Sequence, residues 1–322
     1  MSQIKLKPSL FNTPVLFLIF NRENLTQKVF DKIKLVRPKY LYVAADGPRV
    51  NNIGDIKHCA ETRKVIEQID WECELKTLYR KNNMGCGPAV RSAISWFFEN
   101  VEAGIILEDD CDPNVTFFQF CEELLVKYKD EEVVKFIGGN NFQNGIKRGA
   151  GSYYFSHYPA SWGWATWRRS WHLFQPDITE STKEIKSGKL DGIFNSKQEK
   201  EHWLNSLARA GNESDNIWDF HFYYAIWKSG GLCITPGKNL VVNLGFFDQG
   251  THYFLKDSTK TNVKSETMHF PLIHPDAIAV DVEADKYTFH HFYSHSIQRA
   301  LRLVRENDLT TIFTYFKKRI FK

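Results

Sequence analysis

The sequence predicts an α/β protein whose mostly parallel central sheet is flanked by helices. The first observation is that short apolar runs alternate with segments of helical spacing over the first 140 residues. The second is that polar residues follow directly after several of these runs, at the expected carboxyl ends of strands. Ligands of parallel sheets bind beyond that edge. The chain has 322 residues, 43% of them hydrophobic, which is enough to bury a large core.

Each element of this first part follows from a local pattern. The apolar run 14–20 reads as a buried strand, and 25–36 places its apolar residues on one helical face. The strand at 40–47 ends in the turn residues Asp46, Gly47 and Pro48. The further predicted elements are a helix at 58–69, a strand at 74–79, a helix at 88–99, a strand at 104–107, a helix at 116–128 and a strand at 133–139.

The rest of the chain is less regular. The segment 152–174 is dense in aromatic residues, and 179–200 is polar enough to predict a surface excursion. The further expected elements are helices at 201–209 and 217–227, a strand that becomes a glycine-containing loop at 239–252, and, after a weak pattern from 254, a final helix at 293–320.

Composition excludes some classes of protein. A formal charge of +4, spread evenly, does not indicate a nucleic-acid partner. The six cysteines contain no Cys-x-x-Cys pair and no zinc spacing, so we expect reduced thiols in a cytoplasmic protein. The apolar run 15–20 is too short to span a bilayer, and its position after Pro14 favours a buried strand over a signal-peptide core.

Three consecutive acids, Glu108, Asp109 and Asp110, end the buried strand at 104–107. Like charges this close repel one another, so a metal ion, a basic neighbour or water must offset them. Carboxylates at a strand end suit a hard divalent cation that also binds phosphate, whereas the plain alternative is a solvated turn with a helix cap at Asp112. Strand alternation would direct Glu108 and Asp110 to one side and Asp109 to the other.

Two other polar pairs follow predicted strands. Asn21 and Arg22 come after the first strand, and Asp46 and Gly47 after the second. Together with the acids they are expected at one edge of the sheet, which becomes the default ligand site. The order of these motifs resembles the GT-A-fold (nucleotide-diphospho-sugar transferase) glycosyltransferases. It is more narrowly similar to the N-acetylglucosaminyltransferase I group and to bacterial glycosyltransferases of surface-polysaccharide synthesis.

The resemblance implies roles for this edge. Asp110, the last of the three acids, would be the main ligand of a divalent ion, manganese or magnesium. The residues themselves allow one or two acids to hold the metal, while the rest of Glu108, Asp109 and Asp110 face ribose or solvent. Arg22 would contact the nucleotide, and Asp46 would read its uracil.

The resemblance extends over roughly 14–255. The segment 158–164 is similar to the family's aromatic-Pro-x-x-Gly-Trp motif beside the donor sugar, which implies donor contacts for Gly163 and Trp164. The segment 244–252 resembles a mobile loop that orders over the donor. The resemblance implies a donor contact for Asp248, and a metal or donor-phosphate contact for His252. A lone histidine is more often structural, and the aromatic rings also suit core packing, so both alternatives stay open.

Ile217, Trp218 and Asp219 resemble the family's Trp-Asp segment, which supplies the catalytic base. Apolar neighbours would raise the pKa of Asp219 and make it a better base. A helix cap, or a salt bridge to Arg168 or Arg169, is the structural alternative. Glu213 and Asp215 are spare candidates for the base.

The resemblance therefore divides the chain into a nucleotide-sugar-binding half (1–140), an acceptor-binding and catalytic half of the same domain (141–255), and a C-terminal extension (256–322). That extension is expected to end in a basic amphipathic helix, which either lies on the inner face of the cell membrane or packs on the catalytic domain.

The function expected from these features is metal-dependent, inverting transfer of a sugar, an N-acetylhexosamine by the resemblance, from a UDP-sugar to a glycan or lipid-linked acceptor. A non-catalytic protein that binds nucleotide-sugar or a membrane is the first alternative. A sugar-phosphate nucleotidyltransferase ranks lower, because it would require a glycine-rich basic loop where residues 21–24 read Asn-Arg-Glu-Asn.

Overall fold

An eight-stranded sheet forms the centre of the molecule. The computed structural model describes residues 7–211, 217–246 and 264–293. The strand order is β3-β2-β1-β4-β8-β6-β9-β7, in which β8 and β7 run antiparallel to their neighbours and the other strand pairs are parallel. The strands are β1 (Val15–Ile19), β2 (Tyr40–Ala45), β3 (Glu74–Tyr79), β4 (Ala103–Glu108), β6 (Val134–Gly138), β7 (Tyr153–Ser156), β8 (Trp164–Trp167) and β9 (Leu232–Pro236). The predicted α/β class with a mostly parallel sheet is confirmed.

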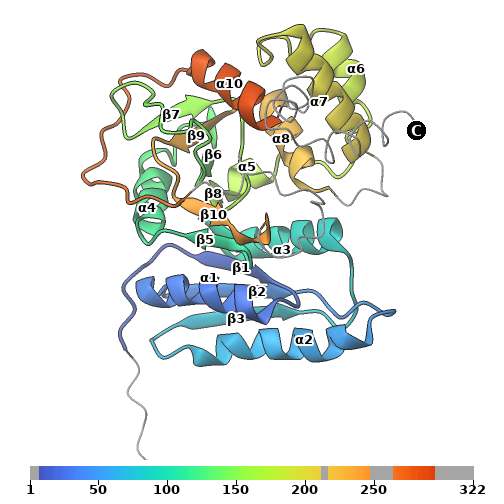
Figure 1. The fold of residues 1–322 in the computed structure, drawn as a ribbon, viewed down its shortest axis with the longest axis vertical. Coiled ribbons are helices and arrows are strands. Elements are labelled where there is room, and N and C mark those ends of the chain that lie inside the picture. The colour runs from blue at the N-terminus through green and yellow to red at the C-terminus, as the bar shows by residue number, and fades with distance from the viewer. Residues whose placement is uncertain (1–6, 212–216, 247–263, 294–322) are drawn as a thin grey trace, which may run out of the picture.

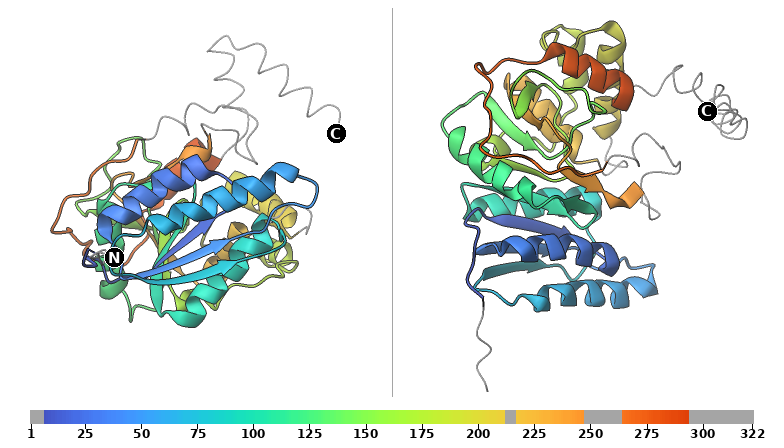
Figure 2. Two further views of the ribbon diagram at one scale, coloured as in Figure 1. Left: turned by 90° about the horizontal axis from the view of Figure 1, so that it is seen from below. Right: turned by 60° about the vertical axis from the view of Figure 1, so that its left-hand side comes forward.

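Helices cover both faces of this sheet (Figure 1). They are α1 (Glu23–Val36), α2 (Ile53–Lys64), α3 (Cys86–Asn100), α4 (Thr116–Lys127), α5 (Arg168–Trp171), α6 (Ser181–Lys186), α7 (Lys197–Ala210), α8 (Asp219–Lys228) and α10 (Val282–Thr288). Short helical turns occur at η1 (Val65–Gln68), η3 (Leu244–Phe246) and η4 (Phe289–Tyr293). Figure 2 shows α1 and α2 on one face and α3 on the opposite face.

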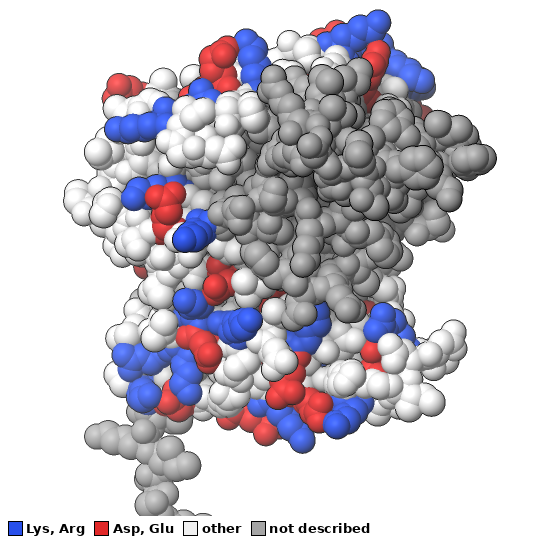
Figure 3. Space-filling view, in the orientation of Figure 1, with Lys and Arg blue, Asp and Glu red and all other residues white. Residues whose placement is uncertain are grey.

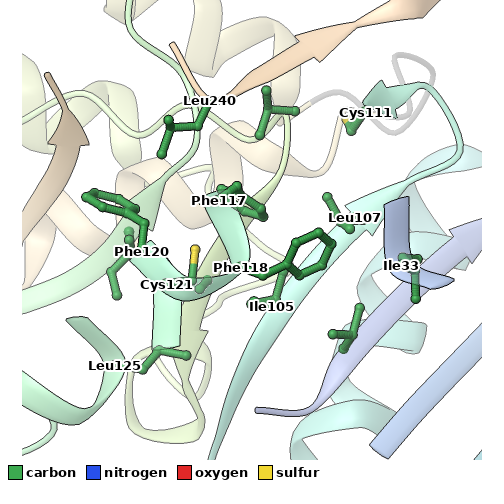
Figure 4. Close-up of a cluster of buried hydrophobic side chains, with 14 of the residues drawn as sticks. Ile33, Ile105, Leu107, Cys111, Phe117, Phe118, Phe120, Cys121, Leu125 and Leu240 are labelled. Carbon is green, nitrogen blue, oxygen red and sulfur yellow. The ribbon is translucent and has the colours of Figure 1, made fainter. Parts of the chain in front are cut away.

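The apolar residues of β1 and β4 alternate between two cores, because successive strand side chains point to opposite faces. Phe17 and Leu107 pack in one core with the buried faces of α1 and α4, as Figure 4 shows for α4 and β4. Leu16 and Ile106 pack in the other, against α3 and α8. The fully apolar strands predicted from the sequence are therefore buried on both sides, and their carboxyl ends are held rigidly at one edge.

The second part of the chain departs from the sequence-based prediction. Residues 179–200 are not a simple surface excursion, because Ile185, Leu190 and Ile193 are buried with α7 and α8 in a third core. The second helix begins at Ile53 rather than at 58. Several elements of the described residues were not predicted. They are β7, β8, β9, α5, α6, α10, η4, and β5 (Cys111–Pro113), which pairs with β10 (Val241–Asn243).

The described part of the C-terminal extension packs on the sheet through a buried acid. Asp285 of α10 accepts hydrogen bonds from Ser156 Oγ, at 2.5 Å, and from the backbone N–H of His157, at 2.9 Å. This contact ties α10 to the end of β7. The predicted helix at 293–320 lies almost entirely outside the described residues. Among the helices of the described ranges, none combines the length and apolar character that crossing a membrane requires.

Candidate functional site

The three acids lie where the rigid part of β4 gives way to a turn. Glu108 is the last residue of β4, and the chain turns at Asp109 and Asp110 before β5 begins. The strand alternation predicted to separate Asp109 from Asp110 therefore does not extend past Glu108. Arg22 contacts both aspartates, so the prediction that they face opposite sides is wrong.

Arg22, just before α1, compensates part of this acidic charge. Its Nε donates to Asp109 Oδ2 at 3.2 Å, its Nη2 donates to Asp109 Oδ1, and its Nη1 lies 3.1 Å from Asp110 Oδ2. Asp109 is 3% exposed, whereas the side chain of Arg22 is 33% exposed. Of the three ways to offset the acids, a basic neighbour is thus present. The nucleotide contact of Arg22 stays a prediction.

One guanidinium does not neutralise three carboxyl groups. Burial, followed by the charges of Asp110 and Asp109, raises the pKa of Glu108, and burial also raises the pKa of Asp109 against the opposing effect of Arg22. Burial lowers the pKa of Arg22, but the two aspartates outweigh it and raise that pKa overall. Burial and the neighbouring acids together disfavour the ionised carboxylates, and a bound cation would favour them.

The donor set is suitable for a metal that shares its coordination with a ligand. Within residues 7–211, 217–246 and 264–293, no group of three His, Cys, Asp or Glu side chains is arranged to hold a metal alone. Magnesium and manganese are commonly bound by one or two carboxylates together with substrate phosphates and water. Asp110 has a half-buried carboxylate beside η3, where a Cβ added to Gly245 would lie 2.5 Å from Asp110 Oδ2. The close approach of Gly245 keeps this carboxylate in a narrow space.

Asp46 organises a neighbouring loop at the same edge. Its carboxylate accepts hydrogen bonds from the backbone N–H groups of Gly47, at 2.8 Å, and Met84, at 3.0 Å, and from Asn83 Nδ2, at 3.0 Å. It is 8% exposed. These bonds give Asp46 a structural role that the sequence did not predict, and its predicted uracil contact is untested.

Asp219 begins α8 and faces the loop before β8. Ser161 Oγ lies 3.4 Å from Asp219 Oδ2, and the hydroxyl of Tyr223, one turn further along α8, donates to Ser161 Oγ at 3.1 Å. Burial raises the pKa of Asp219, in the direction predicted from its apolar neighbours. The N–H of Phe220 donates to Asp219 Oδ1 at 3.0 Å within the first turn of α8, whose N-cap residue is Trp218. The alternative of a salt bridge to the neighbouring arginines does not hold, because Arg168 pairs with Glu102 and Arg169 donates to backbone carbonyls.

Cys86, the first residue of α3, lies within electrostatic range of both the acids and Asp219. Although Cys86 is exposed at the surface, desolvation of its sulfur by the surrounding protein, followed by the charges of Glu108, Asp219 and Asp110, raises the pKa of the thiol. The predicted base and the predicted metal ligand therefore belong to one electrostatic site. Sequence reasoning missed Cys86, although the turn residues Gly85, Gly87 and Pro88 follow a predicted strand just as the other motifs do.

The aromatic motif before β8 has a different role from the predicted one. Trp164 is fully buried, stacked on Phe136 at 4.9 Å and facing Trp218 at 6.0 Å, so its ring is not open to a donor sugar. The prediction of a sugar contact for Trp164 is wrong, because the ring completes the core beneath β8. Gly163 has a φ of +71°, and a Cβ there would meet Val241 at 2.9 Å, so its backbone requires glycine. The predicted contacts of Asp248 and His252 lie outside the described residues, as do the spare bases Glu213 and Asp215.

Comparisons with known proteins give only distant likenesses. No family model matches the chain, and no curated protein matches it. Three solved structures resemble its fold. A cytidylyltransferase from Leptospira borgpetersenii serovar Hardjo-bovis is 12% identical, with 64% of this chain and 72% of that one covered and a TM-score of 0.31. HddC from Yersinia pseudotuberculosis is 8% identical, with 49% and 78% covered and a TM-score of 0.30.

The third is 4-diphosphocytidyl-2C-methyl-D-erythritol synthase from Anaerococcus prevotii, which is 8% identical, with 65% of this chain and 96% of that one covered and a TM-score of 0.30. Likeness at this level carries no argument about activity. The functional case therefore depends on the geometry of the site itself.

Proposed function

We propose that this chain is a metal-dependent glycosyltransferase that moves a sugar from a UDP-sugar to a hydroxyl acceptor with inversion at the anomeric carbon. The observation that carries the proposal is the shared site of two separate carboxylate groups. Ile106 of β4 pairs with Trp164, and Trp164 stacks on Trp218, so the acids that end β4 and Asp219 at the start of α8 belong to adjoining elements. The charge of Asp219 also contributes to the raised pKa of Glu108. One group suits a metal–diphosphate complex, and the other suits a proton acceptor.

One acid of the site would bind the metal, and the basic groups around it would supply further positive charge. Asp110 would hold a manganese or magnesium ion together with phosphate oxygens of the donor. When bound, the ion would neutralise negative charge that develops on the departing diphosphate. Arg22 keeps the Asp109 carboxylate paired and presents further positive charge at the same edge. The N-terminus of α3, at Cys86, adds the positive end of a helix dipole.

Asp219 would take the proton from the attacking acceptor hydroxyl. Its raised pKa increases its basicity, while the hydroxyl of Ser161 contacts Oδ2 and restrains the carboxylate. A single base with direct attack on the anomeric carbon gives inversion. An N-acetylhexosamine donor and a glycan or lipid-linked acceptor are the substrates that the resemblance of the motifs favours.

Calorimetric titration with UDP, with and without manganese, tests the donor half of the proposal. We expect binding that requires the metal and that is lost in Asp110→Asn. Asp112→Asn is the matched control. This acid lies in the same segment, but the charges that act on it are those of Lys32 and Lys28 in α1. Binding of UDP that is unaffected by manganese and by Asp110→Asn would overturn the proposal.

Product analysis tests the transfer step. Incubation with UDP-sugars and a panel of hydroxyl acceptors should release UDP in wild type and not in Asp219→Asn, with UDP binding retained in the variant. Formation of pyrophosphate from a nucleoside triphosphate and a sugar 1-phosphate would instead identify a nucleotidyltransferase. Donor binding without turnover over the whole panel would favour a binding protein.

A further inference from the structure

An uncharged protrusion lies at the same edge of the sheet as the candidate site. Val50, in the loop between β2 and α2, is 93% exposed, and Ile53 and Ile56, on the first turns of α2, are 89% and 65% exposed. Ile53 and Ile56 are three residues apart and therefore lie on one side of the helix. In Figure 1 the loop extends beyond the end of α2, and Figure 3 shows a white protrusion at this place.

A second loop extends this surface. Asn83 Nδ2 donates to the carbonyl of Gly47 at 2.9 Å, and Met84 N–H donates to Asp46, so the loop after β3 lies directly against the loop after β2. Met84 is 47% exposed, and Lys81 beside it is exposed. We call Val50, Ile53, Ile56 and Met84, with the lysines Lys57 and Lys81, the rim patch.

Positive charges predominate in these two loops. Segments 47–58 and 80–84 contain the basic residues Arg49, Lys57, Arg80 and Lys81 and one acid, Asp55. Asp55 is 1% exposed and its carboxylate is held by Arg49, so it presents no free negative charge to the outside. Lys57 is 77% exposed and contacts Glu61 at 3.7 Å, away from the loop. The apolar tip is therefore flanked by basic side chains.

We propose that the rim patch is a membrane-docking surface that inserts Val50, Ile53 and Ile56 into the interfacial region of an anionic bilayer. Nearly complete exposure of several large aliphatic side chains costs free energy in water, and their transfer into a lipid interface recovers it. Neighbouring lysines add attraction to anionic headgroups. Side chains that protrude from a convex tip can enter a lipid bilayer, because a fluid bilayer does not need a preformed pocket for each of them.

The position of the patch gives this contact a consequence. The rim patch and the acids after β4 lie at the same carboxyl edge of the parallel strands β1, β2 and β4. Docking would hold that edge against the bilayer. This consequence rests on the proposed function, because docking would bring the candidate site close to a lipid-linked acceptor. The docking itself does not depend on any activity.

Vesicle co-sedimentation of the full chain tests the docking. We expect the wild-type protein to bind phosphatidylcholine vesicles that contain phosphatidylglycerol, and to bind pure phosphatidylcholine more weakly. The variant Val50→Ser/Ile53→Ser/Ile56→Ser should bind the anionic vesicles about tenfold more weakly or worse. The control Leu10→Ser/Leu35→Ser/Val126→Ser changes side chains that are 60%, 60% and 67% exposed on other parts of the surface, and it should bind as wild type does.

The charge contribution has its own variant. Lys57→Glu/Lys81→Glu should remove the preference for anionic vesicles and leave the weak binding to neutral ones, because it alters headgroup attraction only. Wild-type protein that fails to bind anionic vesicles would overturn the proposal, as would equal binding by the serine variant. Loss of concentration-dependent self-association in the serine variant, without an effect on vesicles, would assign the patch to a second copy of the chain instead. None of these outcomes requires donor binding, so failure here is distinct from failure of the proposed function.

Discussion

The guanidinium of Arg22 binds both oxygens of the Asp109 carboxylate. These residues are far apart in sequence. Arg22 follows β1 and Asp109 follows β4, and these two strands are adjacent and parallel, so the pair links their ends. The backbone of Phe20 also forms a hydrogen bond with this carboxylate, but Arg22 supplies the positive charge that a nearly buried acid next to two other acids requires. The pair therefore has a structural role that precedes any role in ligand binding.

Replacing Arg22 with glutamine should destabilise the unliganded protein. Asp109 would keep its burial and lose its charge partner, which we expect to lower the free energy of unfolding by about 1–3 kcal/mol, because the arginine is partly exposed. Lys200→Gln is the control, since Lys200 pairs with Asp191 at the surface, and it should cost less than about 1 kcal/mol. Urea denaturation measures both. Equal losses would mean that Asp109 does not depend on Arg22.

A methyl group at Gly245 should disturb the proposed metal site without unfolding the protein. The added Cβ would fall 2.5 Å from Asp110 Oδ2, so the carboxylate must move. We expect Gly245→Ala to weaken manganese-dependent UDP binding by about tenfold or more, which corresponds to ~1.4 kcal/mol. In Gly192→Ala the new Cβ would meet nothing within 4 Å, so this variant should bind normally. Identical affinities in the two variants, measured by calorimetry, would count against Asp110 as the ligand.

The pH dependence of transfer should report on Asp219. A base acts in its ionised form, and burial raises the pKa of this carboxyl group, so kcat/KM should rise with pH through a value above the ordinary aspartate pKa of about 3.9. The Ser161 hydroxyl favours the ionised form. Ser161→Ala should therefore move the acid limb to higher pH by roughly half a unit or more, and Ser161→Thr should restore it. An acid limb that moves to lower pH in Ser161→Ala would contradict this assignment.

Asp55 should make the free energy of unfolding depend on pH under acidic conditions. Hydrogen bonds from Arg49 lower its pKa from 3.8 to about 2, so its contribution is present above pH 3.8 and is lost as the pH falls toward about 2. We expect Asp55→Asn to cost about 1–3 kcal/mol near neutral pH. The difference from wild type should shrink over that acidic range in urea titrations. A constant difference would show that the loss comes from packing instead of charge.

The first half of the fold was predictable because its signals are local. The strand Val15–Ile19 is a continuous apolar run, and it is followed by turn residues and by α1, a helix with one apolar face. The second half was harder. Strands Tyr153–Ser156 and Trp164–Trp167 are aromatic and short, and they acquire their hydrogen-bond partners from distant parts of the chain. No window of sequence contains those partners.

The candidate site was also predictable only in part. Residues at strand ends, such as Arg22 and Asp110, come together because parallel topology brings those ends to one edge. The roles of Trp164 and Cys86 were not predictable, because burial depends on which helix covers β8 and on where α3 begins. Asp46 illustrates the same difficulty, since its hydrogen-bond partners lie in a loop that follows the next strand.

The antiparallel strand β8 has a consequence for synthesis of the chain. It lies between β4 and β6, and it pairs Ala103 with Trp167 and Ile137 with Ala165. A nascent chain that has left the ribosome only as far as β6 would expose the apolar edge of β4. Unpaired strand edges of this kind promote aggregation. The edge of β4 therefore stays unpaired until residues 164–167 have emerged, and the sheet is complete only after β9 has followed. A chaperone would be of use during this interval.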